Sequence, residues 1–181
     1  PISVPRAGSA TMAPSGRTRL ASGREGESVM AQPNPPPAED APSPNHGPRR
    51  DGARPDMVVL HYTAMATPEA ACARLRDPAA EVSAHYVLAE DGRLWRLVPE
   101  DRRAWHAGAA RWGDAADVNS RSIGIELANA GAHPFPEPQM TALEALLADI
   151  LARRAIPPER VVGHQDVAPE RKRDPGPRFD W

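Results

Sequence analysis

The segment that runs from Gly163 to Pro177 places several chemically useful side chains close together. His164 and Asp174 are potential metal ligands, and Lys172 stands between them as the only lysine among 22 Lys and Arg residues. Because the chain uses arginine at every other such position, the lysine here points to a chemical requirement. A compact ammonium can approach a small developing anion, whereas a guanidinium presents a planar fork. We therefore take this segment as the first candidate for a catalytic site.

The six histidines differ in the positions that they occupy. His61 and His164 each close a short apolar run, and open α/β sheets place their active sites at such strand ends. His85 lies inside a strand pattern, which is more typical of a satisfied core or pocket-lining histidine than of a ligand. His106 is expected to line a cleft rather than to bind a metal. Two histidines are expected to be solvent-exposed bystanders, namely His46 and His133.

Together with Asp174, the strand-end histidines His61 and His164 form a His-His-Asp set. Three protein ligands leave one coordination position for water, as a catalytic zinc site requires. The spacing alone is weak support, because no H-E-x-x-H or paired C-x-x-C pattern is present. Asp174 precedes Pro175, which favours an extended backbone and a stiff loop. On spacing alone, an aspartate that caps a Pro-Gly turn remains the better interpretation of Asp174.

Glu126 is the best candidate for a general base. Residues 122–128 alternate between branched aliphatic and small or acidic side chains, so Glu126 should point away from the isoleucines, between two small neighbours. A carboxyl group that faces a cleft among apolar neighbours has its pKa raised by desolvation, which suits proton transfer. The alternative is a glutamate on the wet face of an edge strand, and the pattern favours neither.

The elements that must position these residues alternate between strand and helix patterns. Strands are predicted at residues 57–62, 82–88, 93–98, 122–128 and 160–164, and helices at residues 67–76 and 139–154. An Asp91-Gly92 turn signal joins the second and third strands into a hairpin. This order predicts an α/β fold, with a single domain in which helices flank a mixed central β-sheet.

Residues 1–55 are predicted to form a disordered, Pro-rich tail, and residues 56–181 the folded domain. No aromatic residue precedes Tyr62, and the tail contains runs such as Pro35-Pro36-Pro37. Such a segment buries too little apolar surface to offset the entropy lost on ordering. Because the chain begins with Pro1, we expect the natural start at Met30 or Met12, with non-native upstream sequence before it.

Composition excludes several classes of function. A formal net charge of −2 with interspersed signs argues against a nucleic-acid binder. No apolar run approaches the ~18 residues of a membrane span, so no membrane partner is expected. No signal peptide is visible, which predicts a cytoplasmic location, or a periplasmic or secreted one if the natural N-terminus differs. We expect a monomer.

Five separate motifs make this sequence resemble the zinc-dependent N-acetylmuramoyl-L-alanine amidases. This group includes the cytoplasmic peptidoglycan-recycling amidase and is related to phage T7 lysozyme and the peptidoglycan recognition proteins. The motifs lie in order at residues 59–63, 83–92, 104–108, 122–126 and 163–181. The resemblance implies a mixed sheet with helices and a Zn²⁺ ion held by His61, His164 and Asp174.

The resemblance also implies catalytic roles for Glu126 and Lys172, and a groove lined by Trp105 and His106. Glu126 would pass a proton from water to the departing amine, while Lys172 would meet the oxyanion. The implied reaction is hydrolysis of the amide bond between N-acetylmuramic acid and L-alanine, in peptidoglycan or its fragments, with small recycling fragments favoured. Two alternatives remain: a peptidoglycan-binding module that does not cut, and a zinc peptidase acting on another amide.

Overall fold

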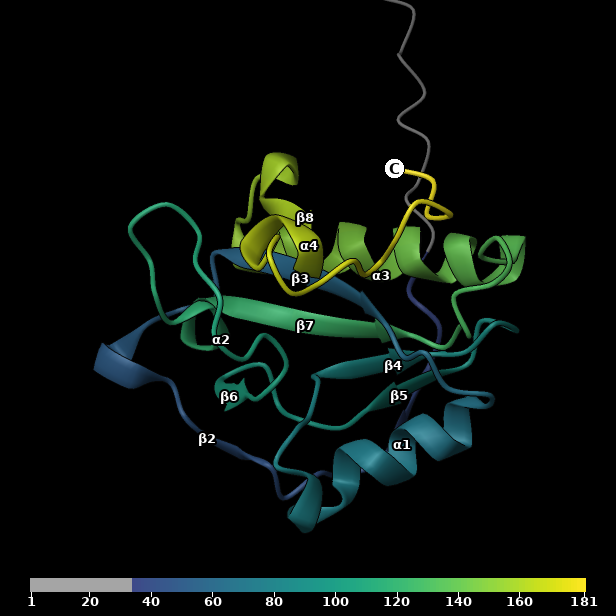
Figure 1. The fold of residues 1–181 in the computed structure, drawn as a ribbon, viewed down its shortest axis with the longest axis horizontal. Helices are drawn as coiled ribbons and strands as arrows, with labels where there is room; N and C mark the ends of the chain where they lie inside the picture. Colours follow the sequence, from purple (N-terminus) through teal and green to yellow (C-terminus); the bar gives the residue numbers. More distant parts are fainter. Residues whose placement is uncertain (1–33) are drawn as a thin grey trace, which may run out of the picture. The chain divides into compact units, whose positions relative to one another are not determined.

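The computed structural model describes residues 34–181, which fold around a six-stranded sheet (Figure 1). The strand order is β1-β5-β4-β7-β3-β8. The strands are β1 (Ala38–Asp40), β3 (Met57–Tyr62), β4 (Tyr86–Leu88), β5 (Leu94–Arg96), β7 (Ser122–Leu127) and β8 (Val161–Gly163). Strands β4, β7, β3 and β8 run parallel, whereas β4 and β5 form the predicted antiparallel hairpin. The predicted mixed α/β sheet is confirmed.

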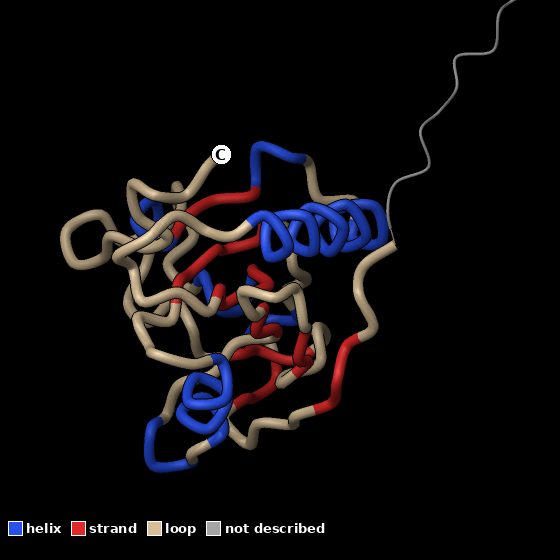
Figure 2. Tube along the Cα trace, turned by 90° about the vertical axis from the view of Figure 1, so that its right-hand side faces the viewer, coloured by secondary structure: helices blue, strands red, loops and turns tan. Residues whose placement is uncertain are grey.

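Helices cover both faces of this sheet, as Figures 1 and 2 show. The α-helices are α1 (Pro68–Arg76), α2 (Val118–Arg121), α3 (Glu137–Arg154) and α4 (His164–Val167). Short 3-10 turns occur at Arg50–Gly52, Pro78–Ala80 and Pro158–Arg160. Within residues 34–181, no helix has both the length and the apolar character that crossing a membrane requires.

Local sequence explains where the two longest helices begin. The Thr67 hydroxyl accepts a hydrogen bond from the Ala70 amide at 3.1 Å, and Pro68 occupies the first helical position of α1. Helix α3 begins at Glu137, two residues before the predicted start at Gln139, because Pro138 is tolerated in a first turn where its missing N–H is not needed.

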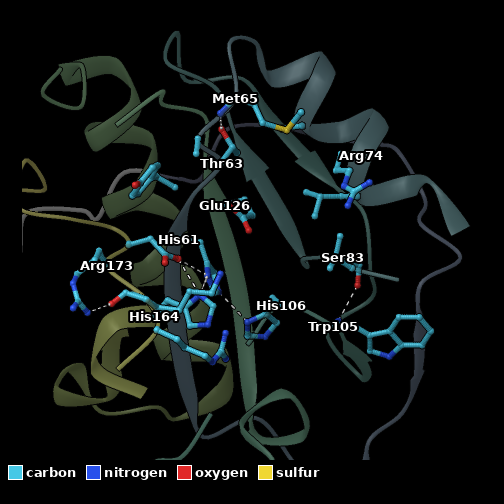
Figure 3. Close-up of a pocket in the computed structure, with 18 residues that line it drawn as sticks. His61, Thr63, Met65, Arg74, Ser83, Trp105, His106, Glu126, His164 and Arg173 are labelled. Atoms are coloured by element: carbon cyan, nitrogen blue, oxygen red, sulfur yellow. Dashed lines mark hydrogen bonds and ion pairs between the residues drawn. The ribbon is translucent and has the colours of Figure 1, made fainter. Parts of the chain in front are cut away.

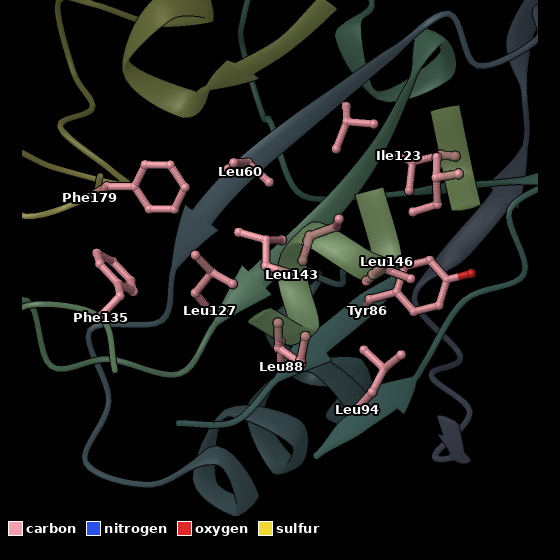
Figure 4. Close-up of a cluster of buried hydrophobic side chains, with 14 of the residues drawn as sticks. Leu60, Tyr86, Leu88, Leu94, Ile123, Leu127, Phe135, Leu143, Leu146 and Phe179 are labelled. Carbon is pink, nitrogen blue, oxygen red and sulfur yellow. The ribbon is translucent and has the colours of Figure 1, made fainter. Parts of the chain in front are cut away.

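Alternation along β3 and β7 gives the sheet two different faces. Leu60, Ile123 and Leu127 pack beneath α3 with Leu143 and Leu146, and Figure 4 shows this cluster. Each such buried side chain contributes about 1.5–3 kcal/mol to stability. The intervening residues of β3 point to the opposite face, where Met57 and Val59 pack in a second cluster. Helix α1 covers this face beside Val87 of β4.

Residues 34–55 belong to the fold, so the prediction of a disordered tail up to residue 55 is wrong for this part. Strand β1 extends the central sheet beside β5, and β2 (His46–Pro48) pairs with β6 (Arg102–Ala104). His46 therefore lies half-buried in a strand, not in an exposed tail. The predicted tail residues 1–33 and the predicted starts at Met12 and Met30 lie outside the described residues.

A buried arginine helps to hold this N-terminal segment in place. The guanidinium of Arg49, which is only 9 % exposed, donates to backbone carbonyl oxygens of Glu100, Asn119, Ser120 and Ser122. The shortest of these contacts, to Ser120, is 2.7 Å. The tail prediction counted aromatic and aliphatic side chains, whereas this segment is held by backbone pairing and by buried polar side chains, which include Ser43 and Asn45 besides Arg49.

Candidate active site

A cavity of about 480 Å³ opens on the sheet face opposite α3, with α1 forming one wall (Figure 3). Every residue predicted to form the site lines this cavity: His61, Trp105, His106, Glu126, His164, Lys172 and Asp174. Strands β3, β7 and β8 bring the carboxyl-terminal ends of three parallel neighbours to one edge of the sheet. This edge is where open α/β sheets place their sites.

Three potential ligand atoms meet at this edge. The Nδ1 atoms of His61 and His164 lie 2.9 Å apart, and each lies 3.0 Å from Oδ2 of Asp174. His61 comes from β3, and His164 begins α4 directly after β8. Asp174 lies in the following loop, and its carboxylate faces the histidines, so the interpretation of Asp174 as a turn cap does not hold.

The geometry and chemistry of this set fit a bound cation. In a tetrahedral site with bonds of about 2.0–2.1 Å, ligand atoms lie ~3.3 Å from one another, close to the separations found here. The outward Nε2 of His164 lies 3.1 Å from the carbonyl oxygen of Ala107. A carbonyl only accepts, so His164 carries its proton on Nε2 and presents an unprotonated Nδ1 to the site.

Burial and neighbouring charge set the ionisation of the ligands. Burial lowers the pKa of His61 to about 4, although its contact with Asp174 opposes this shift. Burial opposes ionisation of Asp174, but the adjacent rings of His164 and His61 hold its pKa well below its usual range. A neutral imidazole and an ionised carboxylate are the forms that bind metals.

Glu126 projects from β7 toward the same cavity (Figure 3). Its Oε2 atom is buried and has no hydrogen-bond partner among the described residues. Burial and, to a smaller extent, the charge of Asp174 raise the pKa of Glu126 to about 8, although Lys172 opposes the shift. The edge-strand interpretation of Glu126 is wrong, because β7 lies between β4 and β3 inside the sheet.

The family of this chain follows from comparison with known proteins. Residues 51–177 match the family model described as N-acetylmuramoyl-L-alanine amidase. The chain belongs to that amidase family. The resemblance predicted from the five motifs is thereby confirmed.

Two curated relatives within this family are similar to the chain in sequence. N-acetylmuramoyl-L-alanine amidase AmiD of Escherichia coli K12 is 43% identical over 141 residues, which cover 69% of this chain and 50% of AmiD. The chain therefore spans about half the length of that relative. The 1,6-anhydro-N-acetylmuramyl-L-alanine amidase AmpD of Enterobacter cloacae is 34% identical over 161 residues, covering 80% of this chain and 86% of AmpD.

A solved structure shares the fold of this chain. The complex of E. coli AmiD with the substrate anhydro-N-acetylmuramic acid-L-Ala-D-γ-Glu-L-Lys aligns with a TM-score of 0.65 and 42% identity. The alignment covers 72% of this chain and 57% of that one.

The other residues that line the cavity include two that the sequence predicted and one that it did not. Lys172, in the loop after α4, is half-buried, and Trp105 lies toward the opposite end of the cavity from Arg173 (Figure 3). Arg74 of α1 also lines the cavity and was not predicted. Its position depends on how α1 packs against the sheet, and nothing in its own sequence neighbourhood indicates this.

The structure places three histidines that were expected to lie outside a metal site. His85 is the predicted core histidine, fully buried, and its Nδ1 accepts a hydrogen bond from the Gly124 amide at 2.9 Å. Burial lowers the pKa of His85 to about 3, which keeps it neutral. His133 is exposed and pairs with Glu90 at 2.8 Å. His106 lines the cavity as predicted, and it also contacts His61.

Proposed function

We propose that this amidase is a Zn²⁺-dependent hydrolase of the amide bond between N-acetylmuramic acid and L-alanine in peptidoglycan fragments. The observation that carries the proposal is that a His-His-Asp set shares one cavity with the half-buried carboxyl group of Glu126, whose Oε2 atom is buried and has no partner among the described residues. The names of the relatives AmpD and AmiD support this bond as the substrate. The AmiD complex with an anhydromuropeptide supports a fragment of that kind.

His61, His164 and Asp174 would hold the metal. Two imidazoles with one carboxylate suit zinc better than they suit magnesium or calcium, which prefer sets made of oxygen atoms. Bound Zn²⁺ would polarise the scissile carbonyl and lower the pKa of a water molecule toward ~7. The remaining chemistry falls to side chains of the protein.

Glu126 is the proton carrier in this proposal. Its carboxyl group is protonated at neutral pH when only burial acts, and a nearby dication favours the ionised form, so its pKa is poised near the working pH. Glu126 accepts a proton from the water whose oxygen bonds to the lactyl carbonyl carbon. It then delivers that proton to the nitrogen of L-alanine as the carbon–nitrogen bond breaks.

Lys172 stabilises the negative charge that develops on the carbonyl oxygen. Lys172 lines the cavity, and its backbone amide donates a 3.0 Å hydrogen bond to the carbonyl oxygen of Ala168, the residue that follows α4. One such contact is typically worth about 10²–10³ in rate. Trp105 supplies an aromatic surface along which the sugar or the peptide can lie.

Product analysis on a defined muropeptide tests the proposal. Purified protein with added Zn²⁺ should release a lactyl-bearing sugar and a peptide with a free L-alanine amine, both identified by mass spectrometry. Chelation should abolish the reaction and Zn²⁺ should restore it. Binding without product would favour a recognition module instead, and cleavage between two amino acids would favour a zinc peptidase; either result would contradict the proposal.

A further inference from the structure

A chain of hydrogen bonds runs from the backbone of α2 to the ligand His61. The Ser122 hydroxyl lies 2.6 Å from the carbonyl oxygen of Val118 and 3.0 Å from Nε2 of His106. On the other side of its ring, His106 places Nδ1 at 3.0 Å from Nε2 of His61. His106 therefore has both ring nitrogens in contact with protein atoms.

Only one assignment of donors and acceptors fits this series of hydrogen bonds. The carbonyl of Val118 can only accept, so the Ser122 hydroxyl donates to it and accepts from Nε2–H of His106. A neutral imidazole with its proton on Nε2 has an unprotonated Nδ1, which must accept from Nε2–H of His61. These positions are assigned from the hydrogen-bond network. His61 is thereby left with an unprotonated Nδ1, the atom that faces His164 and Asp174.

The position of the His106 ring is itself built into the fold. A Cβ atom at residue 124 would lie 2.5 Å from the ring, so only glycine fits there on β7. The backbone of the ring's own loop is fixed by Asn119, whose Oδ1 accepts from the amides of His106 at 3.1 Å and Ala107 at 2.8 Å. The contact with His61 is therefore a fixed feature of the strand packing.

We propose that His106 is a positioning residue that fixes the tautomer and ring orientation of the metal ligand His61. The inference rests on the metal site of the proposed function. The next residue, Ala107, does the same for His164 through its carbonyl oxygen. Two adjacent residues in one loop thus orient both histidine ligands, although only the contact to His61 uses a side chain.

The joint result is a site that attracts a cation. With both outward nitrogens held in this way, the two Nδ1 atoms and Oδ2 of Asp174 are three ligand atoms that meet at 2.9–3.0 Å. A cation satisfies all three. Partners that orient metal-bound histidines in this way are typically worth 10–100-fold in metal affinity.

Zinc affinity of full-length variants tests the proposal, measured by competition with a chelator of known affinity. H106A should bind Zn²⁺ about 10–100-fold more weakly than wild type. H106N should keep most of the wild-type affinity that H106A loses. The Oδ1 atom of the asparagine can accept the hydrogen bond from His61 that Nδ1 of His106 accepts in wild type. H133A removes an exposed histidine outside the cavity and should bind as wild type does. Wild-type affinity in H106A, or equal weakness in H106A and H106N, would overturn the proposal.

Histidine NMR on the metal-free full-length chain reads the tautomer directly and does not depend on activity. His61 should be protonated on Nε2 alone in wild type and in H106N, and should become a mixture of tautomers in H106A. S122A keeps the His106 ring and removes only the hydroxyl that accepts from it, so it should also give a mixture of His61 tautomers. If H106A does not fold, S122A tests the proposal in its place. A single Nε2–H tautomer in S122A and H106A would contradict the role of His106. Failure of wild type itself to bind Zn²⁺ would count against the proposed function, and the NMR result would still test His106.

Discussion

His61 and Glu126 are direct register partners on the adjacent parallel strands β3 and β7. Adjacent strands lie about 4.8 Å apart, and both side chains point to the face opposite α3. The sheet itself therefore sets the distance between a proposed metal ligand and the proposed base. A slip of one residue in this pairing would send one of the two side chains to the core face.

Replacing Glu126 with glutamine should separate metal binding from catalysis. E126Q keeps the shape of the side chain but cannot carry the proton, so kcat should fall by about 10²–10⁴ while the zinc content stays near that of wild type. Steady-state kinetics and metal analysis measure the two quantities. E144Q, at an exposed position of α3, is the matched control. Turnover of E126Q within a few-fold of wild type would remove Glu126 from its role.

Replacing Lys172 with arginine should show whether a compact ammonium is required. K172R preserves the charge, but its planar fork meets the oxyanion differently, and we expect kcat to fall toward the 10²–10³ loss that is typical of removing such a contact. Zinc affinity should change little, because Lys172 is not one of the three metal-binding residues. R178K makes the reverse exchange at an exposed position outside this cavity and should be active. Full activity in K172R would show that charge alone suffices.

The sequence predicted the site well because its chemistry follows from strand ends and alternation. His61, Glu126 and His164 each lie where a short apolar strand pattern ends or turns polar, and parallel pairing then brings them together. The sequence could not predict contacts that arise only when distant segments pack. Arg49 binds carbonyls that lie 51 to 73 residues further along the chain, and the contact of His106 with His61 spans 45 residues.

The raised pKa of Glu126 predicts how the stability of the metal-free protein depends on pH. In the unfolded chain Glu126 ionises near 4.5, whereas in the fold it stays protonated up to about 8. Between these values the folded state binds the extra proton, so stability falls as pH rises through this window and levels off above it. The free energy of unfolding, measured by urea titration, should fall between pH 5 and pH 8 in wild type. This fall should be a few kcal/mol larger in wild type than in E126Q. Parallel curves for the two proteins would show that Glu126 is not desolvated in this way.

The hydrogen bonds of Arg49 lead us to predict that the segment before β3 contributes to stability. R49A would leave buried carbonyl oxygens of Glu100, Ser120 and Ser122 without their donor, and each such loss costs about 1–3 kcal/mol. We therefore expect R49A to lower the free energy of unfolding by about 3 kcal/mol or more in denaturant titrations. R50A is the matched control, because the side chain of Arg50 is 68% exposed and makes only a 3.6 Å surface pair with Asp117, worth less than about 1 kcal/mol. Equal stability of the two variants would mean that the buried guanidinium of Arg49 contributes nothing to the free energy of unfolding.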